Sequence, residues 1–317
     1  MDTSQVLGEL AAAGVNAWPE SSRSFATDTG RSIFLSFRSR PPTPTDIERD
    51  LQKIGDDWML YQVRSMTQGL RRAVVGNSRL IVWDDETSTL WLNREAHREE
   101  TTATPRPRGR RPYVRLAIAR SLVLDPRPRR QAEIAFELGA PQSGVSHALK
   151  HLCGEGRLVD RVEGGYAATD ARKLWEHFMH RYPGPGGITT YWWHDAPLED
   201  QANMVGEQAT PLVSGDLAAR TIAPWRQPEH VTLYLGEGLD PSTLGFAMGS
   251  PDDYTLSITV PDDQTIFATA ERYGSLRGYV DPLLAAYDVQ KTGTTGDQQE
   301  AAERVRDTVL RHRDSGA

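Results

Sequence analysis

The sequence predicts an α/β protein in three parts: a small α/β N-terminal domain, a central winged helix-turn-helix and an α/β C-terminal domain. Three observations predict this arrangement. Residues 130–150 have the pattern of two short helices joined by a tight turn. Residues 156–168 have the pattern of a two-stranded hairpin. Strand and helix patterns alternate on both sides of this central part.

The first helix of the central pair carries Ile134, Ala135 and Leu138 at a spacing that buries one side of a helix. Ala135 is small, so a second helix can cross close to it. Gly139 stands where this helix must end, because glycine adopts the left-handed conformation of a helix C-terminus without steric cost. Pro141 cannot continue the first helix but can open the next one.

The second helix divides into an apolar face and a polar face. We expect Val145, Ala148, Leu149 and Leu152 to face inward. The polar face carries short or amide-bearing donors and acceptors suited to base edges and phosphates. These residues are Gln142, Ser143, Ser146, His147 and Lys150. The pattern predicts a helix that reads bases in the major groove of DNA; the alternative is an ordinary helical hairpin with a solvated polar face.

The hairpin after this helix is expected to act as a wing, with its turn at residues 163–165. Arg157, Arg161 and Tyr166 would reach the adjacent DNA backbone or minor groove. Arg130, at the start of the helix pair, belongs to the same set of predicted DNA-binding residues. Residues 114–124 supply the leading helix of this part, and residues 170–181 supply its last helix.

A basic, proline-rich linker at residues 101–112 precedes the winged helix. Its arginines are predicted to lie in a narrow A·T-rich minor groove, because proline keeps the segment extended. They are Arg106, Arg108, Arg110 and Arg111. The segment resembles an AT-hook, although Arg111 intrudes before the final proline of that motif. The alternative is a solvated, proline-stiffened linker.

The charge of the central part differs from that of the rest of the chain. The formal net charge is −7, which argues against a protein that coats DNA without regard to sequence. Residues 104–161, however, hold twelve basic and five acidic residues, a balance of +7 against −14 elsewhere. A basic part between acidic flanks favours a binder directed to particular sites, since phosphate neutralisation supplies affinity.

Composition predicts a soluble protein. Of the 317 residues, 38% are hydrophobic, and the mean hydropathy is −0.53. No apolar run approaches the ~20 residues of a membrane span, and the first residues lack the blocks of a signal peptide. With Cys153 alone, neither an internal disulfide nor a cysteine-clustered zinc site is expected. We therefore expect a cytoplasmic protein with no membrane contact, no metal and no cofactor.

The predicted domains span residues 1–100 and 183–317 on either side of the linker and of the winged helix at 113–182. In the first of these, strands are expected at 32–37, 58–63, 80–84 and 89–93, and helices at 43–54 and 67–75. In the second, strands are expected at 230–235, 254–260 and 265–269, and helices at 214–222, 280–289 and 297–313.

We do not predict an enzyme. The N-terminal domain has the element order of a degenerate restriction-nuclease fold, whose sites combine an acidic residue with Glu-x-Lys to hold Mg²⁺. Asp84, Asp85 and Glu86 are candidates, but no Glu-x-Lys follows, so we expect an exposed hairpin turn. His194 and Asp195 could form an acid/base pair, but no accompanying catalytic motif is present, which favours a structural role.

The chain from about residue 113 to 313 resembles the AbiEi-type antitoxin family of transcriptional regulators in type IV toxin–antitoxin systems. The resemblance lies in the winged helix and in residues 211–219, 230–235, 280–287 and 300–304. It implies a protein that represses its own operon and whose C-terminal domain neutralises a nucleotidyltransferase toxin. The family places its winged helix at the extreme N-terminus, whereas about 110 residues precede it here.

The main expectation is a sequence-specific regulator that binds double-stranded DNA as a homodimer on an inverted repeat. Two alternatives remain open. The first is an antitoxin whose main task is to bind a partner toxin. The second is a DNA-processing protein with a nuclease-like N-terminal domain.

Overall fold

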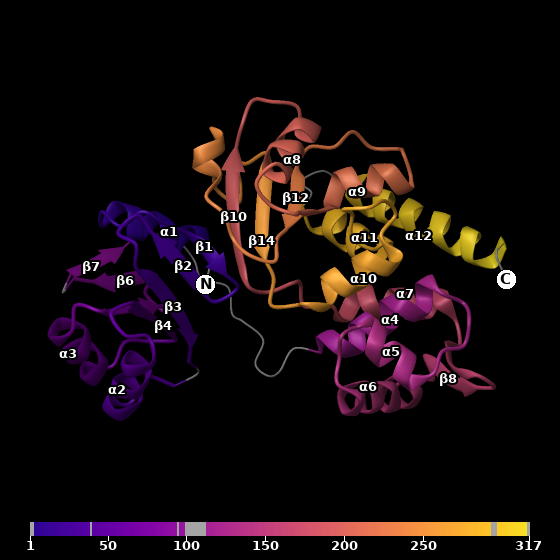
Figure 1. Ribbon diagram of the computed structural model, residues 1–317, viewed down its shortest axis with the longest axis horizontal. Coiled ribbons are helices and arrows are strands. Elements are labelled where there is room, and N and C mark those ends of the chain that lie inside the picture. Colours follow the sequence, from indigo (N-terminus) through magenta and orange to yellow (C-terminus); the bar gives the residue numbers. More distant parts are fainter. Residues whose placement is uncertain (1–2, 39, 94, 99–111, 293–296, 316–317) are drawn as a thin grey trace.

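The computed structural model describes residues 3–38, 40–93, 95–98, 112–292 and 297–315. In these ranges the chain is a mixed α/β structure with twelve α-helices and three sheets. Figure 1 shows the N-terminal sheet on one side of the molecule and the mostly helical parts that follow residue 112 on the other. No helix in these ranges is long and apolar enough to cross a bilayer.

The first unit is a seven-stranded sheet whose strands lie side by side in sequence order. The strands are β1 (Ala17–Ser21), β2 (Ser24–Thr27), β3 (Ser32–Phe37), β4 (Trp58–Val63), β5 (Leu80–Asp84), β6 (Thr89–Leu92) and β7 (Glu95–Arg98). Strands β3, β4 and β5 are parallel, and the outer pairs are antiparallel. The four strands expected here are confirmed as β3 to β6.

Helices cover both faces of this sheet, because side chains alternate between the faces along each strand. On one face α2 (Pro44–Lys53) and α3 (Gln68–Gly76) pack on residues such as Tyr61 and Val82. On the other face α1 (Thr3–Ala12) packs in a core that includes Leu60, Ile81 and Trp83. The helices predicted at 43–54 and 67–75 are thus α2 and α3 with their capping residues.

The second unit begins at residue 112 and contains four helices and a hairpin. These elements are α4 (Tyr113–Leu124), α5 (Gln131–Glu137), α6 (Gln142–Gly154), β8 (Val159–Val162), β9 (Gly165–Ala168) and α7 (Ala171–Arg181). Strands β8 and β9 pair antiparallel and form a sheet of their own. Every element predicted between residues 114 and 181 is present within a few residues of its expected bounds.

The third unit contains a five-stranded sheet in the order β11–β12–β14–β10–β13. Its strands are β10 (Ile188–Trp193), β11 (Leu212–Ser214), β12 (Val231–Tyr234), β13 (Ala247–Met248) and β14 (Leu256–Val260). Its helices are α8 (Leu198–Gly206), α9 (Gly215–Ile222), the 3₁₀ turn η1 (Pro241–Leu244), α10 (Thr265–Tyr273), α11 (Pro282–Lys291) and α12 (Asp297–Ser315). Strands β12 and β14 are parallel, and the other pairs are antiparallel.

The strand predicted at residues 265–269 is wrong, because this segment begins helix α10. The buried residues Thr265, Ile266, Thr269 and Ala270 follow helical spacing rather than alternation. The hydroxyl of Thr269 donates to the carbonyl oxygens of Thr265 and Ile266, which satisfies it within the helix. The β-branched residues favour a strand, but packing against the rest of the fold stabilises a helix here instead.

The second and third units share one hydrophobic core. Helix α4 is buried on every side from Leu116 to Val123. It packs on α6 and α7 within its own unit and on α10 from the third unit. The side chain of Arg313, near the end of α12, donates to the carbonyl oxygens of Leu122 and Val123. The predicted boundary at residue 182 therefore crosses a continuous core.

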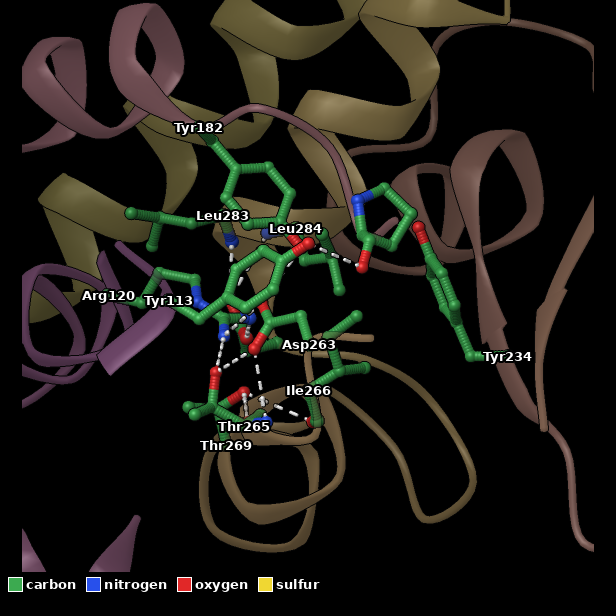
Figure 2. A network of polar contacts seen from close by, with 12 residues as sticks. Tyr113, Arg120, Tyr182, Tyr234, Asp263, Thr265, Ile266, Thr269, Leu283 and Leu284 are labelled. Atoms are coloured by element: carbon green, nitrogen blue, oxygen red, sulfur yellow. Dashed lines mark hydrogen bonds and ion pairs between the residues drawn. The ribbon is translucent and has the colours of Figure 1, made fainter. Parts of the chain in front are cut away.

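A buried network of polar side chains joins the same two units, as Figure 2 shows. Arg120 of α4 is fully buried and donates to the carboxylate of Asp281 at 2.7 Å and to the hydroxyl of Thr265 at 3.0 Å. The carboxylate of Asp263 lies 3.8 Å from the same guanidinium and accepts from the hydroxyl of Tyr182 at 2.9 Å. Arg120 therefore faces two buried carboxylates of the third unit.

The N-terminal sheet is attached to the third unit by close backbone contact. The amide of Gly238 donates to the carbonyl oxygen of Glu20 at 2.9 Å. A Cβ at position 238 would lie 1.7 Å from the carbonyl oxygen of Pro19, so only glycine permits this approach. Ile188 of β10 is part of the core beneath α1.

Candidate nucleic-acid interface

Helix α6 is placed by a tight turn that the sequence predicts. Gly139 has φ of +57°, the left-handed conformation expected at the end of α5. The amide of Ala140 donates to the carbonyl oxygen of Ala135 at 3.0 Å, which closes the turn. The side chain of Gln131 then donates to the carbonyl oxygen of Gln142 at 3.0 Å and ties the two helices together.

The two predicted faces of α6 are observed. Its apolar face is buried, and consists of Val145, Ala148, Leu149 and Leu152. The five residues predicted to read DNA are all exposed on the other face; they are Gln142, Ser143, Ser146, His147 and Lys150. In Figure 1, α6 lies at the lower edge of the molecule, away from the third unit. A polar helical surface is therefore open to a large partner.

The hairpin β8–β9 is fixed beside this surface through the segment that precedes α5. Arg129 and Tyr166 exchange two backbone hydrogen bonds, at 3.0 and 2.8 Å. A Cβ at Gly165 would lie 2.2 Å from the carbonyl oxygen of Arg129, so a glycine is required at this contact. Gly164 and Gly165 both have positive φ, as the predicted turn requires.

The remaining predicted DNA-binding residues differ in their exposure to solvent. Arg157 and Arg161 of the hairpin and Arg130 before α5 are exposed. Tyr166 is half-buried and packs against the core, so its ring is partly engaged within the protein. The linker arginines Arg106, Arg108, Arg110 and Arg111 lie outside the described residues.

The charge available at this surface is smaller than the sequence count indicates. Arg120 is fully buried in the network described above. Arg129 is also buried, and its guanidinium contacts the carboxylate of Glu137 and the hydroxyl of Tyr273. Arg127 is exposed but lies 2.8 Å from the carboxylate of Asp125. These three arginines are engaged by groups of the protein itself, which leaves fewer arginines for an external anion.

A groove of about 620 Å³ runs along α6 and the first turn of α4. Ser143 and His147 line it, together with Arg115 of α4 and His151 of α6. Sequence reasoning missed the last two residues. His151 follows Ser143 and His147 at steps of four residues, which is a signal the sequence contains. Arg115 has no such signal, because only the crossing of α4 and α6 brings it here.

The candidate catalytic residues have structural contacts. Asp84 was expected in an exposed turn, but it is buried and accepts the backbone amides of Met66, Glu86 and Thr87 at 3.0 to 3.3 Å. It therefore caps a loop, because a buried carboxylate needs such donors. The Nδ1 atom of His194 accepts the amide of Ala196 at 2.9 Å.

No group of three or more His, Cys, Asp or Glu side chains in the described ranges is arranged to hold a metal ion.

No protein-family model matches this chain, and neither a curated protein nor a solved structure matches it. The resemblance to AbiEi-type antitoxins therefore stays a prediction, as does the toxin partner that it implies.

Proposed function

We propose that this protein is a sequence-specific regulator that binds double-stranded DNA through a winged helix-turn-helix at residues 113–182. One observation carries the proposal: the polar face of α6 is exposed along its length while the opposite face is buried in the core. Hydroxyl, amide and imidazole groups on one helical face match the donors and acceptors of base edges in the major groove.

The neighbouring elements support the same proposal. The order of three helices followed by a short hairpin is that of a winged helix, in which the third helix enters the major groove. Here α6 is the third helix, and the hairpin is attached to the segment before α5. Arg157 and Arg161 of the hairpin are exposed and available for phosphates.

We further propose that the protein acts as a homodimer. One short helix reads only a few base pairs, which is too little for a unique site in a genome. A two-fold dimer places two such helices one turn of DNA apart on an inverted repeat.

The test compares two lysine variants of the same unit. Lys150→Ala removes an ammonium group from the exposed face of α6, and Lys173→Ala removes one from the exposed side of α7. Genomic fragments retained by the wild-type protein are sequenced, and the affinity of each variant is then measured on the enriched site and on a scrambled duplex. We expect Lys150→Ala to lose affinity for the enriched site while Lys173→Ala keeps it.

Gln142→Ala and His147→Ala extend this test to base reading. Each is expected to lose ~1–3 kcal/mol of discrimination between the enriched and the scrambled site. Arg157→Ala, in contrast, is expected to weaken binding to both duplexes equally. Absence of any enriched sequence, or equal behaviour of the two lysine variants, contradicts the proposal.

A further inference from the structure

The groove beside α6 is bordered by cationic and polar groups from two helices. Arg115 comes from the first turn of α4, while Ser143, His147 and His151 come from α6. The Nη1 atom of Arg115 lies 3.2 Å from Nδ1 of His151. The rings of His147 and His151 lie side by side, with centroids 6.0 Å apart. A guanidinium and two imidazoles therefore border one open groove.

The charges that face these groups leave a positive excess. Glu155, the C-cap residue of α6, lies 3.9 Å from Arg115 and 3.7 Å from His151. The same carboxylate also faces Arg181 of α7, at 3.3 Å. His177 of α7 is partly buried, and burial lowers its pKa, which favours its neutral form. Two guanidinium groups, those of Arg115 and Arg181, are thus opposed by one carboxylate.

The beginning of α6 adds uncapped donors to the same groove. Pro141 is the N-cap residue, and its side chain makes no capping hydrogen bond to the first amides of this helix. Ser143 and Gly144, in that first turn, both line the groove. Amides at the start of a helix favour anions, because their N–H groups point outward and the helix dipole is positive there.

We propose that this groove binds a phosphate group of the DNA backbone, with Arg115 and His151 as the residues that hold it. The inference rests on the proposed function, and it extends the DNA interface from α6 to the start of α4. Arginine and protonated histidine form charge-assisted hydrogen bonds to phosphate oxygens, which are stronger than neutral ones. The groove runs along the helix that would lie in the major groove, so its anion is a backbone phosphate at the groove's edge.

The proposal also predicts a dependence on pH. Histidine changes its charge between about pH 5 and pH 8. A phosphate held by His151 forms the stronger, charge-assisted hydrogen bond with the protonated imidazole. Binding should therefore take up a proton, and affinity for DNA should rise as the pH falls.

The first experiment measures the salt dependence of binding to a short mixed-sequence duplex, because phosphate contacts need no particular base sequence. Affinity falls as the salt concentration rises, and loss of one phosphate contact makes the slope of log affinity against log salt less negative by about 0.9. We expect this change for Arg115→Gln. The matched control is Arg172→Gln, an exposed arginine of α7 outside the groove, and it should keep the wild-type slope. Equal slopes for the two variants overturn the proposal.

The second experiment follows duplex affinity from about pH 8 to pH 6. Wild-type affinity should rise, His151→Gln should show a smaller rise, and His180→Gln, an exposed histidine of α7, should behave as the wild type does. An identical pH profile for His151→Gln and the wild type removes His151 from the site. Thermal unfolding of each variant checks that it is folded.

Titration with inorganic phosphate identifies the source of the anion. If phosphate binds and Arg115→Gln abolishes this binding while duplex affinity is unchanged, the groove holds a free anion and the proposal is overturned. A wild-type protein that binds no duplex refutes the proposed function itself. A wild-type protein that binds duplex, with Arg115→Gln unaffected, refutes only the role of the groove.

Discussion

Asp288 is the buried side chain whose environment has the clearest consequence for stability. It lies on α11, and its carboxylate accepts the hydroxyls of Ser214 at 2.5 Å and Tyr234 at 2.8 Å. Burial raises the pKa of Asp288 to about 7, and the charge of Asp281 contributes in the same direction. The folded protein therefore holds a proton at pH values where the unfolded chain has lost it.

Replacing Asp288 with asparagine should change how stability depends on pH. The stabilising effect of the retained proton is fully present below about pH 4, the pKa of aspartate in an unfolded chain, and is lost as the pH rises to about 7. An asparagine side chain cannot ionise, so the Asp288→Asn variant lacks this dependence on pH. The difference in free energy of unfolding, variant minus wild type, should therefore increase by roughly 1 kcal/mol for each pH unit across this window. Urea unfolding at several pH values measures it; a difference that is constant with pH contradicts the assignment.

The burial of ionisable residues such as Arg120 and Arg129 could not be predicted from the sequence. Arginine is usually exposed, so Arg120 and Arg129 were counted with the basic surface. The structure places both in the interior, where residues distant in sequence meet them: the carboxylate of Asp281 for Arg120, and the hydroxyl of Tyr273, beside the nearby Glu137, for Arg129. Such pairs depend on the tertiary fold and leave no local pattern.

At the scale of elements, most helices and strands could be predicted from local sequence patterns. The helices and hairpin of residues 113–181 have their own periodicity, their own glycines and their own turn, so they were predicted correctly. Residues 265–269 were not, because their β-branched side chains satisfy their hydroxyls inside a helix. The exposed face of α6 was predictable for the same local reason, whereas Arg115 joins that face only through helix crossing.

Gly165 gives a test at this scale. A Cβ there would meet the backbone of Arg129, while a Cβ at Gly164 would meet only Pro128, at 3.6 Å. Both glycines have positive φ, so both alanine variants carry backbone strain. We expect Gly164→Ala to cost about 1 kcal/mol and Gly165→Ala at least twice that, because it also pushes the hairpin away. Thermal unfolding gives the cost, and equal losses would show that the contact with Arg129 is unimportant.

At the scale of the whole molecule, Arg120 is the polar centre of the joint between the second and third units. Arg120→Met leaves Asp281 and Asp263 buried without their cation, which should lower the free energy of unfolding by about 3–5 kcal/mol. Arg127→Met is the control, since that arginine is exposed beside Asp125 and should matter little. Chemical denaturation measures both; a small effect of Arg120→Met would mean that water or another cation compensates the carboxylates.

Because α4 is buried on every side, the second unit cannot be separated from the third without exposing its core. The rear surface of α4 belongs to residues beyond 182, so the four helices and hairpin are not a cassette that can be transplanted onto another protein. Without the third unit, the apolar residues on one side of α4 would be exposed to water, and Arg120 would lack its carboxylate partners. A segment transferred to another protein would therefore have to contain the second unit together with the third.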